Sequence, residues 1–147
     1  MQKKKISNTK KLETSASEFR RSMNRQEQQA NLVGEENVRR MLLFYAVECG
    51  GKYQLLKKDN CFLFNRMPEK HKNMLHDIQS IMKELGLEEK CDFPVVRSKH
   101  GDDIYPNHYQ EMWRYGIDCE DAKEQGRYIE ENLRKALGLL HDLERRR

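Results

Sequence analysis

The sequence predicts an all-α protein: a bundle of four to five helices that follows a flexible, basic N-terminal tail. Apolar residues recur at steps of three and four along two long segments, which is the spacing of one helix face. The 147 residues include only 3 prolines and 8 glycines, too few for a chain of many short strands and tight turns. This length suits one domain, so we assign residues 1–15 to the tail and 16–147 to a single helical domain.

Composition excludes several classes of protein. Hydrophobic residues make up 37% of the chain, the mean hydropathy is −1.01, and no apolar run approaches the roughly 18–20 residues of a membrane span. The first 30 residues contain no apolar signal-peptide segment. We therefore expect a cytoplasmic protein without membrane contact.

The four cysteines do not have the spacing of a metal centre. They are Cys49, Cys61, Cys91 and Cys119. Zinc knuckles and ribbons need two close pairs of ligands, and no Cys-x-x-Cys pair is present. Free thiols in a reducing cytoplasm are then the simplest interpretation, and we expect neither a metal nor another cofactor.

The net charge of +4 is concentrated at the two ends of the chain. Residues 1–12 hold five lysines and no acidic residue, and the chain ends in three arginines; without these eight, 20 basic residues stand against 24 acidic ones. A domain with a negative net charge does not offer a broad surface for nucleic acid. The basic tails can still bind RNA, DNA or an acidic partner in a salt-sensitive way. The alternative is a tail that only improves solubility. The candidate nucleic-acid-binding residues of the tail are Lys3, Lys4, Lys5, Lys10 and Lys11.

Two helices are predicted in the first half of the domain. A polar helix begins near Ser17 and is interrupted at Gly34. A second segment, 35–58, carries apolar residues at helical spacing on both sides of the glycine pair 50–51. Two glycines cost a helix roughly 2 kcal/mol, so a break followed by a strand over 52–56 is the alternative. We favour one continuous helix because the spacing keeps its phase, and we expect the glycines to let another helix approach closely.

The middle of the chain predicts one further helix and one irregular stretch. Residues 61–64 form a short apolar patch, either a strand-like loop or a buried turn. A helix then begins at Pro68, carries apolar residues at steps of four and three, and ends at Gly86. Between 89 and 107 no periodicity persists, and a loop of that length in a small domain tends to be functional or mobile.

The last third predicts a short helix and a long one. Residues 108–115 form the short helix, which would bring aromatic side chains to the core. From Cys119 to Leu143 apolar residues alternate at steps of four and three, a heptad-like seam that suits packing within a bundle or against a helix of a second subunit. Acidic residues at the start of this helix and arginines at its end match the helix macrodipole.

Three short motifs precede the last helix. They are AVECGGKYQLL at 46–56, LHDIQSIM at 75–82 and WRYG at 113–116. Their order and spacing resemble the HEPN superfamily, the higher eukaryote and prokaryote nucleotide-binding domains, whose members show an AxE…K…LL helix, an HDL…L helix and an RYP-like turn before the last helix. The resemblance covers residues 35–143.

This resemblance implies a helical bundle, usually a homodimer, whose catalytic members are metal-independent endoribonucleases. Their signature is Arg-x(4–6)-His: the histidine would transfer protons at the ribose 2′-hydroxyl or the leaving oxygen, and the arginine would hold the scissile phosphate. Members without the signature act as RNA-binding or partner-binding modules beside nucleotidyltransferases, often in toxin–antitoxin or antiviral defence settings.

The chain departs from that catalytic signature. The spacing occurs twice, but neither pair lies just ahead of the last helix, where the family keeps it, and chance pairing is common in so charged a chain. Arginine and histidine residues are nevertheless present in the expected region, and they are our first choice. The first-choice catalytic residues are Arg97, His100 and Arg114; the pairs with the signature spacing are Arg66 with His71 and, as the second choice, Arg134 with His141.

Three further features each have a structural interpretation. Tyr115 could stack on an RNA base, although an aromatic residue that follows a loop more often covers a core. We expect the imidazole of His76 to hydrogen-bond a neighbouring helix, and the acidic residues near His100 to be solvated rather than to bind a metal.

Three functions therefore stay open. The leading hypothesis is a HEPN-like protein that acts on RNA, either as an endoribonuclease or as the RNA-binding half of a defence or toxin module. The first alternative is a non-catalytic helical module that binds a protein partner, such as an effector or nucleotidyltransferase subunit. The second is a nucleic-acid accessory protein that uses its lysine tail.

Overall fold

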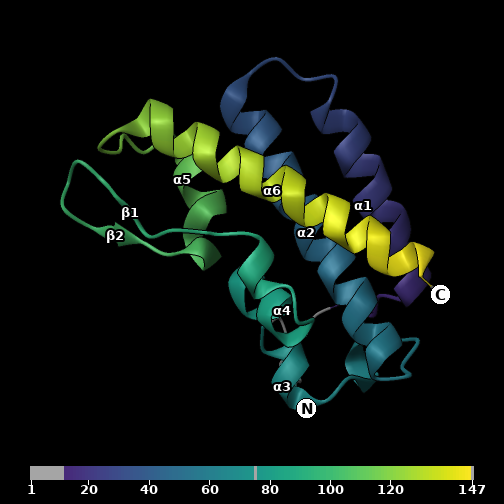
Figure 1. The fold of residues 1–147 in the computed structure, drawn as a ribbon. Coiled ribbons are helices and arrows are strands. Elements are labelled where there is room, and N and C mark those ends of the chain that lie inside the picture. The colour runs from purple at the N-terminus through teal and green to yellow at the C-terminus, as the bar shows by residue number, and fades with distance from the viewer. Residues whose placement is uncertain (1–11, 75, 147) are drawn as a thin grey trace, which may run out of the picture.

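The computed structural model describes residues 12–74 and 76–146, and it confirms the predicted all-α class (Figure 1). The five tail lysines lie outside the described residues. Within the described part the α-helices are α1 (Ala16–Ala30), α2 (Glu36–Lys58), α3 (Glu69–Lys72), α4 (Ile78–Glu84), α5 (Tyr109–Tyr115) and α6 (Ala122–Arg145). Between them lie the strands β1 (Val96–Arg97) and β2 (Asp103–Ile104) and the 3-10 turns η1 (Phe64–Arg66), η2 (Glu88–Lys90) and η3 (Pro106–His108). None of the helices in these residues has both the length and the apolar character needed to cross a membrane.

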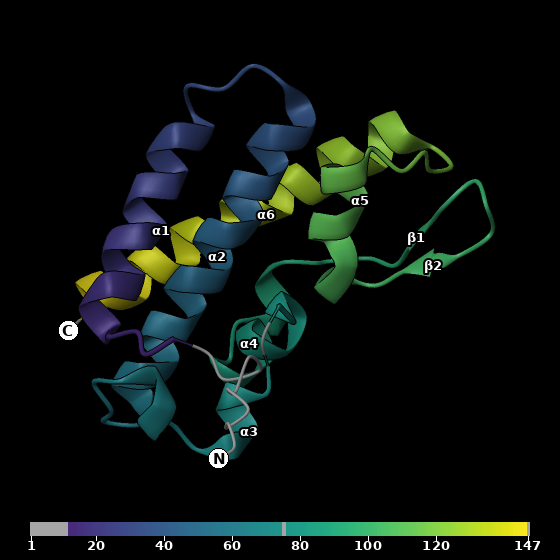
Figure 2. The ribbon, with the colours of Figure 1, turned by 180° about the vertical axis from the view of Figure 1, so that it is seen from behind.

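Helix α2 is the centre of the arrangement. It contacts α1, α4, α5 and α6, and both ribbon views show α6 crossing the α1–α2 pair at an angle (Figures 1 and 2). Helix α5 and the β1–β2 hairpin lie on the side away from α1. Helix α2 begins where Glu35 accepts hydrogen bonds from the backbone N–H groups of Asn37 and Val38. Two lysines in the last turn of α2 suit the helix dipole.

The glycine pair lies inside the unbroken helix α2, which confirms the continuous-helix prediction. A Cβ atom at Gly50 would overlap Met23 of α1 and would lie 3.1 Å from Leu140 Cδ1 of α6. A Cβ atom at Gly51 would overlap Ile81 of α4. Three helices therefore approach α2 at this point more closely than a larger residue would allow, as the sequence predicted.

The main core lies between α2, α5 and α6. The ring centroid of Phe44 on α2 is 6.4 Å from those of Tyr109 and Trp113 on α5, which are 5.5 Å from each other. These three residues are buried, so the prediction that the 108–115 helix brings aromatic side chains to the core is confirmed. The seam of α6 packs within the same bundle, and its fully buried members are Ile129, Leu133, Ala136 and Leu140.

The prediction of a single helix from Pro68 to Gly86 is wrong. Helix α3 ends at Lys72, and α4 begins only at Ile78. The reason is Asp77, whose carboxylate accepts from the Ser80 backbone N–H at 3.1 Å and from the Ser80 hydroxyl at 2.7 Å. An aspartate in this position competes with the helix hydrogen bonds before it and begins a new helix.

The segment 89–107 contains a hairpin that the sequence did not predict. Strand β1 pairs antiparallel with β2, with Val96 opposite Ile104. Two-residue strands are too short to show a periodicity. Residues 97–99 are also hydrogen-bonded to the turn before α6. Glu120 N donates to the Arg97 carbonyl at 3.0 Å, and Lys99 N donates to the Asp118 carbonyl at 2.9 Å. The hairpin is therefore anchored at the entry to the last helix.

The residues just before α1 are bonded to the 61–65 loop. Phe64 N donates to Thr14 O at 2.8 Å, and Ala16 N donates to the Phe62 carbonyl at 2.7 Å. An isolated bridge joins Ser15 to Leu63, so the first part of the apolar patch takes the strand-like alternative, and its last residue, Phe64, begins η1. Residues 14 and 15, which the sequence assigned to the tail, are thus hydrogen-bonded to the domain.

Candidate functional site

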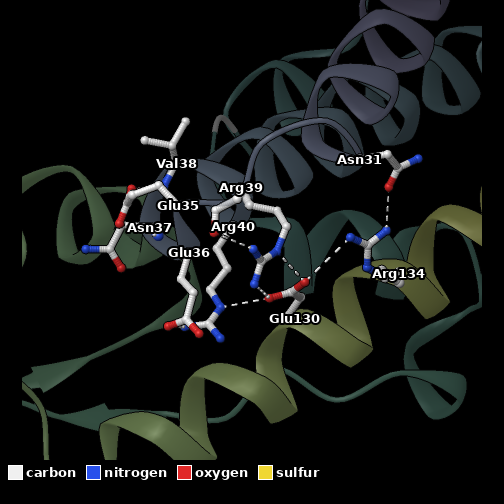
Figure 3. A network of polar contacts seen from close by, with 10 residues as sticks. Asn31, Glu35, Glu36, Asn37, Val38, Arg39, Arg40, Glu130 and Arg134 are labelled. Atoms are coloured by element: carbon white, nitrogen blue, oxygen red, sulfur yellow. Dashed lines mark hydrogen bonds and ion pairs between the residues drawn. The ribbon is translucent and has the colours of Figure 1, made fainter.

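Three arginine side chains converge on one carboxylate between α2 and α6 (Figure 3). Arg39 donates from Nε to Glu130 Oε2 at 2.8 Å and from Nη2 to Oε1 at 3.1 Å. Arg40 donates from Nε to Glu130 Oε1 at 2.9 Å, and Arg134 Nη2 lies 3.5 Å from Oε2. We call these four residues the arginine cluster. Its charge-assisted hydrogen bonds join the start of α2 to α6.

Arg40 reaches this position because α6 carries a glycine opposite it. A Cβ atom at Gly126 would lie 2.9 Å from Arg40 Cζ and closer still to Nη1. The Arg40 side chain is only 10% exposed, and its Nη1 lies 3.6 Å from Glu36 Oε1, one turn earlier on α2. A charge this deeply buried requires partners, and here it has two carboxylates.

The charged groups of the arginine cluster hold one another in their ionised forms. Burial alone would raise the pKa of the Glu130 carboxyl, but the hydrogen bonds from Arg39 and Arg40 hold that pKa below its ordinary value. The bond to Glu130 in turn raises the pKa of the Arg39 guanidinium. Three guanidinium groups thus contact the carboxylate of Glu130, and the charges of Glu36 and Glu35 act on the same cluster.

A pocket of about 400 Å³ lies beside the arginine cluster, where the start of α2, the end of α5 and the first turns of α6 meet. Part of its lining is apolar and includes Trp113 and Ile129, and the rest is polar and includes Arg40, Asp118 and Lys123. Such a volume and mixed lining are typical of sites for small molecules. We call it the α5–α6 pocket. Arg40 belongs both to its wall and to the arginine cluster.

The first-choice catalytic residues do not belong to the lining of this pocket and are not joined into one centre. Arg97 is paired at 3.2 Å with an aspartate of β2, and His100 is exposed in the hairpin turn. Arg114 donates to the Tyr45 hydroxyl at 3.2 Å and lies 5.7 Å from the ring centroid of Tyr115, which is 67% exposed. In residues 12–74 and 76–146 no hydrogen bond or ion pair links any two of the three.

The second-choice pair is divided between other partners. His141 Nε2 lies 2.8 Å from Glu27 Oε1, and Arg134 donates from Nη1 to Asn31 Oδ1 at 2.9 Å in addition to its contact with Glu130. Both side chains therefore hold α6 against α1 and the turn that follows it.

His71, the histidine of the remaining pair, is buried between two carboxylates. Its Nδ1 lies 2.6 Å from Asp59 Oδ2, and its Nε2 lies 3.1 Å from Glu84 Oε2. Burial alone would lower the pKa of the imidazole, but the two carboxylates outweigh it and raise that pKa. Only the protonated ring donates from both nitrogens, so the charged form joins the end of α2 to α4 and leaves no ring nitrogen for a substrate.

We expect His71→Gln to destabilise the protein by roughly 2 kcal/mol near pH 6, and by less at higher pH. Because the folded-state pKa is raised, the contribution is complete below the unfolded pKa of about 6.5 and disappears as the pH rises through the folded value. Urea unfolding of both proteins between about pH 5.5 and 9 measures the difference. The exposed His100→Gln is the control, and a difference that grows with pH would contradict the assignment.

Residues of two of the three sequence motifs meet farther along α2. The Lys52 ammonium donates to Glu48 Oε2 at 2.9 Å, and His76 Nδ1 lies 2.9 Å from the same oxygen. This confirms that the His76 imidazole bonds a neighbouring helix. Burial of the Glu48–Lys52 ion pair could not be inferred from the motif letters, because lysine and glutamate four residues apart are common on exposed helix faces.

The arginine cluster itself escaped the sequence analysis. The contacts of Arg39 and Arg40 with Glu130 join residues 91 and 90 positions apart, and charged residues make up 35% of the chain, so nothing in the sequence singles out these three residues. Arg134 was selected only for its spacing to His141. One signal was present. Gly126 interrupts a strongly helical stretch, and an interior helix glycine often marks a close approach by another group.

Comparison of the chain with protein-family models, with curated proteins and with solved structures gave no match. The likeness to HEPN domains therefore depends on the three sequence motifs. The RNA, homodimer and protein-partner hypotheses stay predictions.

Proposed function

We propose that this helical protein acts on RNA and holds an unpaired nucleotide in the α5–α6 pocket. The observation that carries the proposal is the Arg40 guanidinium, a buried and permanently charged group in the wall of a partly apolar pocket. A guanidinium suits a phosphate, and the apolar lining around Trp113 suits the face of a base.

Groups around the pocket support the same ligand. Lys123 lines it in the first turn of α6, and Arg114 and Tyr115 are exposed at the end of α5. Cationic side chains beside an exposed aromatic ring are common in sites that bind single-stranded nucleic acid. The choice of RNA over DNA comes from the HEPN resemblance.

Binding is tested with a fluorescein-labelled single-stranded RNA, by fluorescence anisotropy over a series of salt concentrations. We expect Lys123→Gln to raise the Kd about tenfold and to reduce the slope of log K against log salt by about 1, because one phosphate contact is lost. Arg40 is left intact in this test because its ion pairs also hold the fold together.

Lys83→Gln is the matched control, since Lys83 is an exposed lysine on α4, outside the pocket lining. It should bind RNA as the unsubstituted protein does. Equal losses in the two variants would mean non-specific attraction, and an unchanged Kd in Lys123→Gln would remove the pocket from the proposal. Deletion of residues 1–11 measures the contribution of the five tail lysines separately.

Cleavage is the second part of the proposal and is assigned to the first-choice residues. We expect it to proceed in EDTA and to be lost in His100→Ala, because a positioned histidine contributes about 10²–10⁴-fold to such proton transfers. Denaturing gels of end-labelled RNA provide the measurement. RNA that stays intact with the unsubstituted protein, while anisotropy shows binding, would limit the function to binding.

A further inference from the structure

A second cavity lies at the other end of α5. It measures about 320 Å³ and is formed by residues before α4, by η3 and by the first turn of α5. Its wall includes the imidazoles of His76 and His108 and the amide of Gln110. The α5–α6 pocket is formed by the other end of the seven-residue α5, about 10 Å away along the helix axis, so the two sites are separate.

His76 is held at one ring nitrogen by a buried carboxylate. Its Nδ1 lies 2.9 Å from Glu48 Oε2, which also accepts from Lys52 Nζ at 2.9 Å. Burial alone would raise the pKa of the Glu48 carboxyl, but the hydrogen bonds from His76 and Lys52 bring that pKa below its ordinary value. A charged carboxylate only accepts hydrogen bonds, so the proton of a neutral His76 ring is on Nδ1 and the lone pair is on Nε2.

The other ring nitrogen of His76, Nε2, has no such protein partner among the described residues. The side chain is 50% exposed and lines the cavity, and no hydrogen-bond partner of Nε2 is found among residues 12–74 and 76–146. A buried ion pair such as Glu48–Lys52 adds little net stability to a fold. An imidazole held at Nδ1 by a carboxylate, with Nε2 open to a cavity, is the arrangement of a general base.

The charges around the cavity select the class of substrate. Asp77 and Glu111 belong to its lining, so a phosphodiester or a carboxylate would meet like charges, whereas a neutral acyl compound would not. Gln110 is buried, and its Oε1 has no hydrogen-bond partner within the described residues. Because Oε1 is shielded from solvent, the NH₂ group is the end of the amide that can donate to a developing oxyanion in the cavity.

We propose that this cavity is a hydrolytic site for small neutral carboxylic esters, with His76 as general base and Glu48 as its positioning residue. Nε2 of His76 takes a proton from water while the water oxygen bonds to the carbonyl carbon. The bond from that carbon to the alcohol oxygen then breaks, and protonated His108 gives this oxygen a proton. The products are a carboxylic acid and an alcohol, and solvent returns the proton from His76 to His108.

Turnover of p-nitrophenyl acetate by the full chain tests this proposal, with absorbance followed well past the first equivalent so that simple acylation of the protein is not counted. We expect a rate above that of free imidazole at five times the protein concentration, because the chain has 5 histidines. We expect His76→Gln, at a half-exposed position, to lower kcat/KM by about 100-fold or more.

His141→Gln is the matched control, because His141 is also paired with a glutamate, at 2.8 Å, but packs α6 against α1. It should leave turnover unchanged. Turnover no faster than that of free imidazole, or equal losses in His76→Gln and His141→Gln, would overturn the proposal. RNA binding measured with His76→Gln should be unchanged, so failure here and failure of the RNA proposal can be told apart.

Two further variants separate the roles of the residues. His108→Gln should slow phenyl acetate more than p-nitrophenyl acetate, because phenolate needs a proton more than nitrophenolate does; equal slowing would remove His108 as the acid. Glu48→Gln should lower kcat at unchanged KM and abolish the Nδ1-protonated form of His76 in ¹⁵N NMR spectra. A folded Glu48→Gln protein with the original kcat and the original His76 tautomer would overturn the positioning role of Glu48. If Glu48→Gln does not fold, His76→Gln is the variant that decides the proposal.

Discussion

Replacing Glu130 with alanine should lower the free energy of unfolding by about 3–5 kcal/mol. The substitution leaves Arg39 and Arg40, whose side chains are 20% and 10% exposed, facing each other without their shared carboxylate. Removing one partner of a buried pair costs more than the pair contributes, because the remaining charges are still shielded from water. Urea denaturation at neutral pH measures the change.

Glu131→Ala is the control for this experiment. Glu131 is the exposed neighbour of Glu130 on α6, and its replacement should alter stability by less than about 0.5 kcal/mol. Similar losses in both variants would show that the effect belongs to the helix rather than to the arginine cluster.

The pH dependence of the Glu130 contribution has a definite sign. Because the folded-state pKa of this carboxyl is lowered, its contribution is complete above the unfolded value of about 4.3 and is lost as the pH falls through the folded value. The difference between the unsubstituted protein and Glu130→Ala should therefore shrink in acid. This is opposite to the expectation for His71→Gln, whose effect shrinks toward alkaline pH.

The second large effect is expected at the glycine pair. Gly51→Ala should destabilise the protein by about 1–3 kcal/mol, although alanine favours a helix over glycine by about 1 kcal/mol. The new methyl group would overlap the side chain of Ile81, which is fully buried and β-branched and so has no free rotamer to move into. Helix α4 would have to move away from α2.

Gly138→Ala provides the matched substitution inside a helix. Gly138 lies in the interior of α6 and is exposed, and a Cβ atom there would meet nothing within 4 Å. The helix preference for alanine then acts alone, and the variant should be more stable by up to about 1 kcal/mol. Thermal unfolding of the two variants should shift in opposite directions, and a stabilised Gly51→Ala would contradict the close contact between α2 and α4.

The elements that the sequence predicted well are those whose burial repeats along the chain. Helix α6 exposes one side and buries the other over many turns, so its apolar spacing stands out. Helix α2 is buried on every side from Gly50 to Leu56, and the apolar steps of three and four still continue through it. The prediction was wrong at 68–86 because the hydrogen bonds of Asp77 act over three residues and leave the apolar spacing unchanged. It missed β1 and β2 because each strand has only two residues.

The candidate site was less predictable than the fold. The sequence singled out arginines and histidines by their spacing in the chain, and the structure gives most of them partners elsewhere: Arg97 with Asp103, His141 with Glu27. Spacing along a helix determines which residues share a face, but not which residue of another helix lies opposite. His76 was the exception, since its bond to a neighbouring helix was predicted.

The sequence by itself determined that this chain is helical and that its basic excess is at the chain ends, and it favoured one helix through the glycine pair. These are properties of local periodicity and composition. Only the tertiary structure decided that Arg39, Arg40 and Arg134 share Glu130, and that Glu48 fixes the orientation of His76. The physical reason is that the strength of a charged contact depends on separation and burial in space, and these arise only when distant helices pack together.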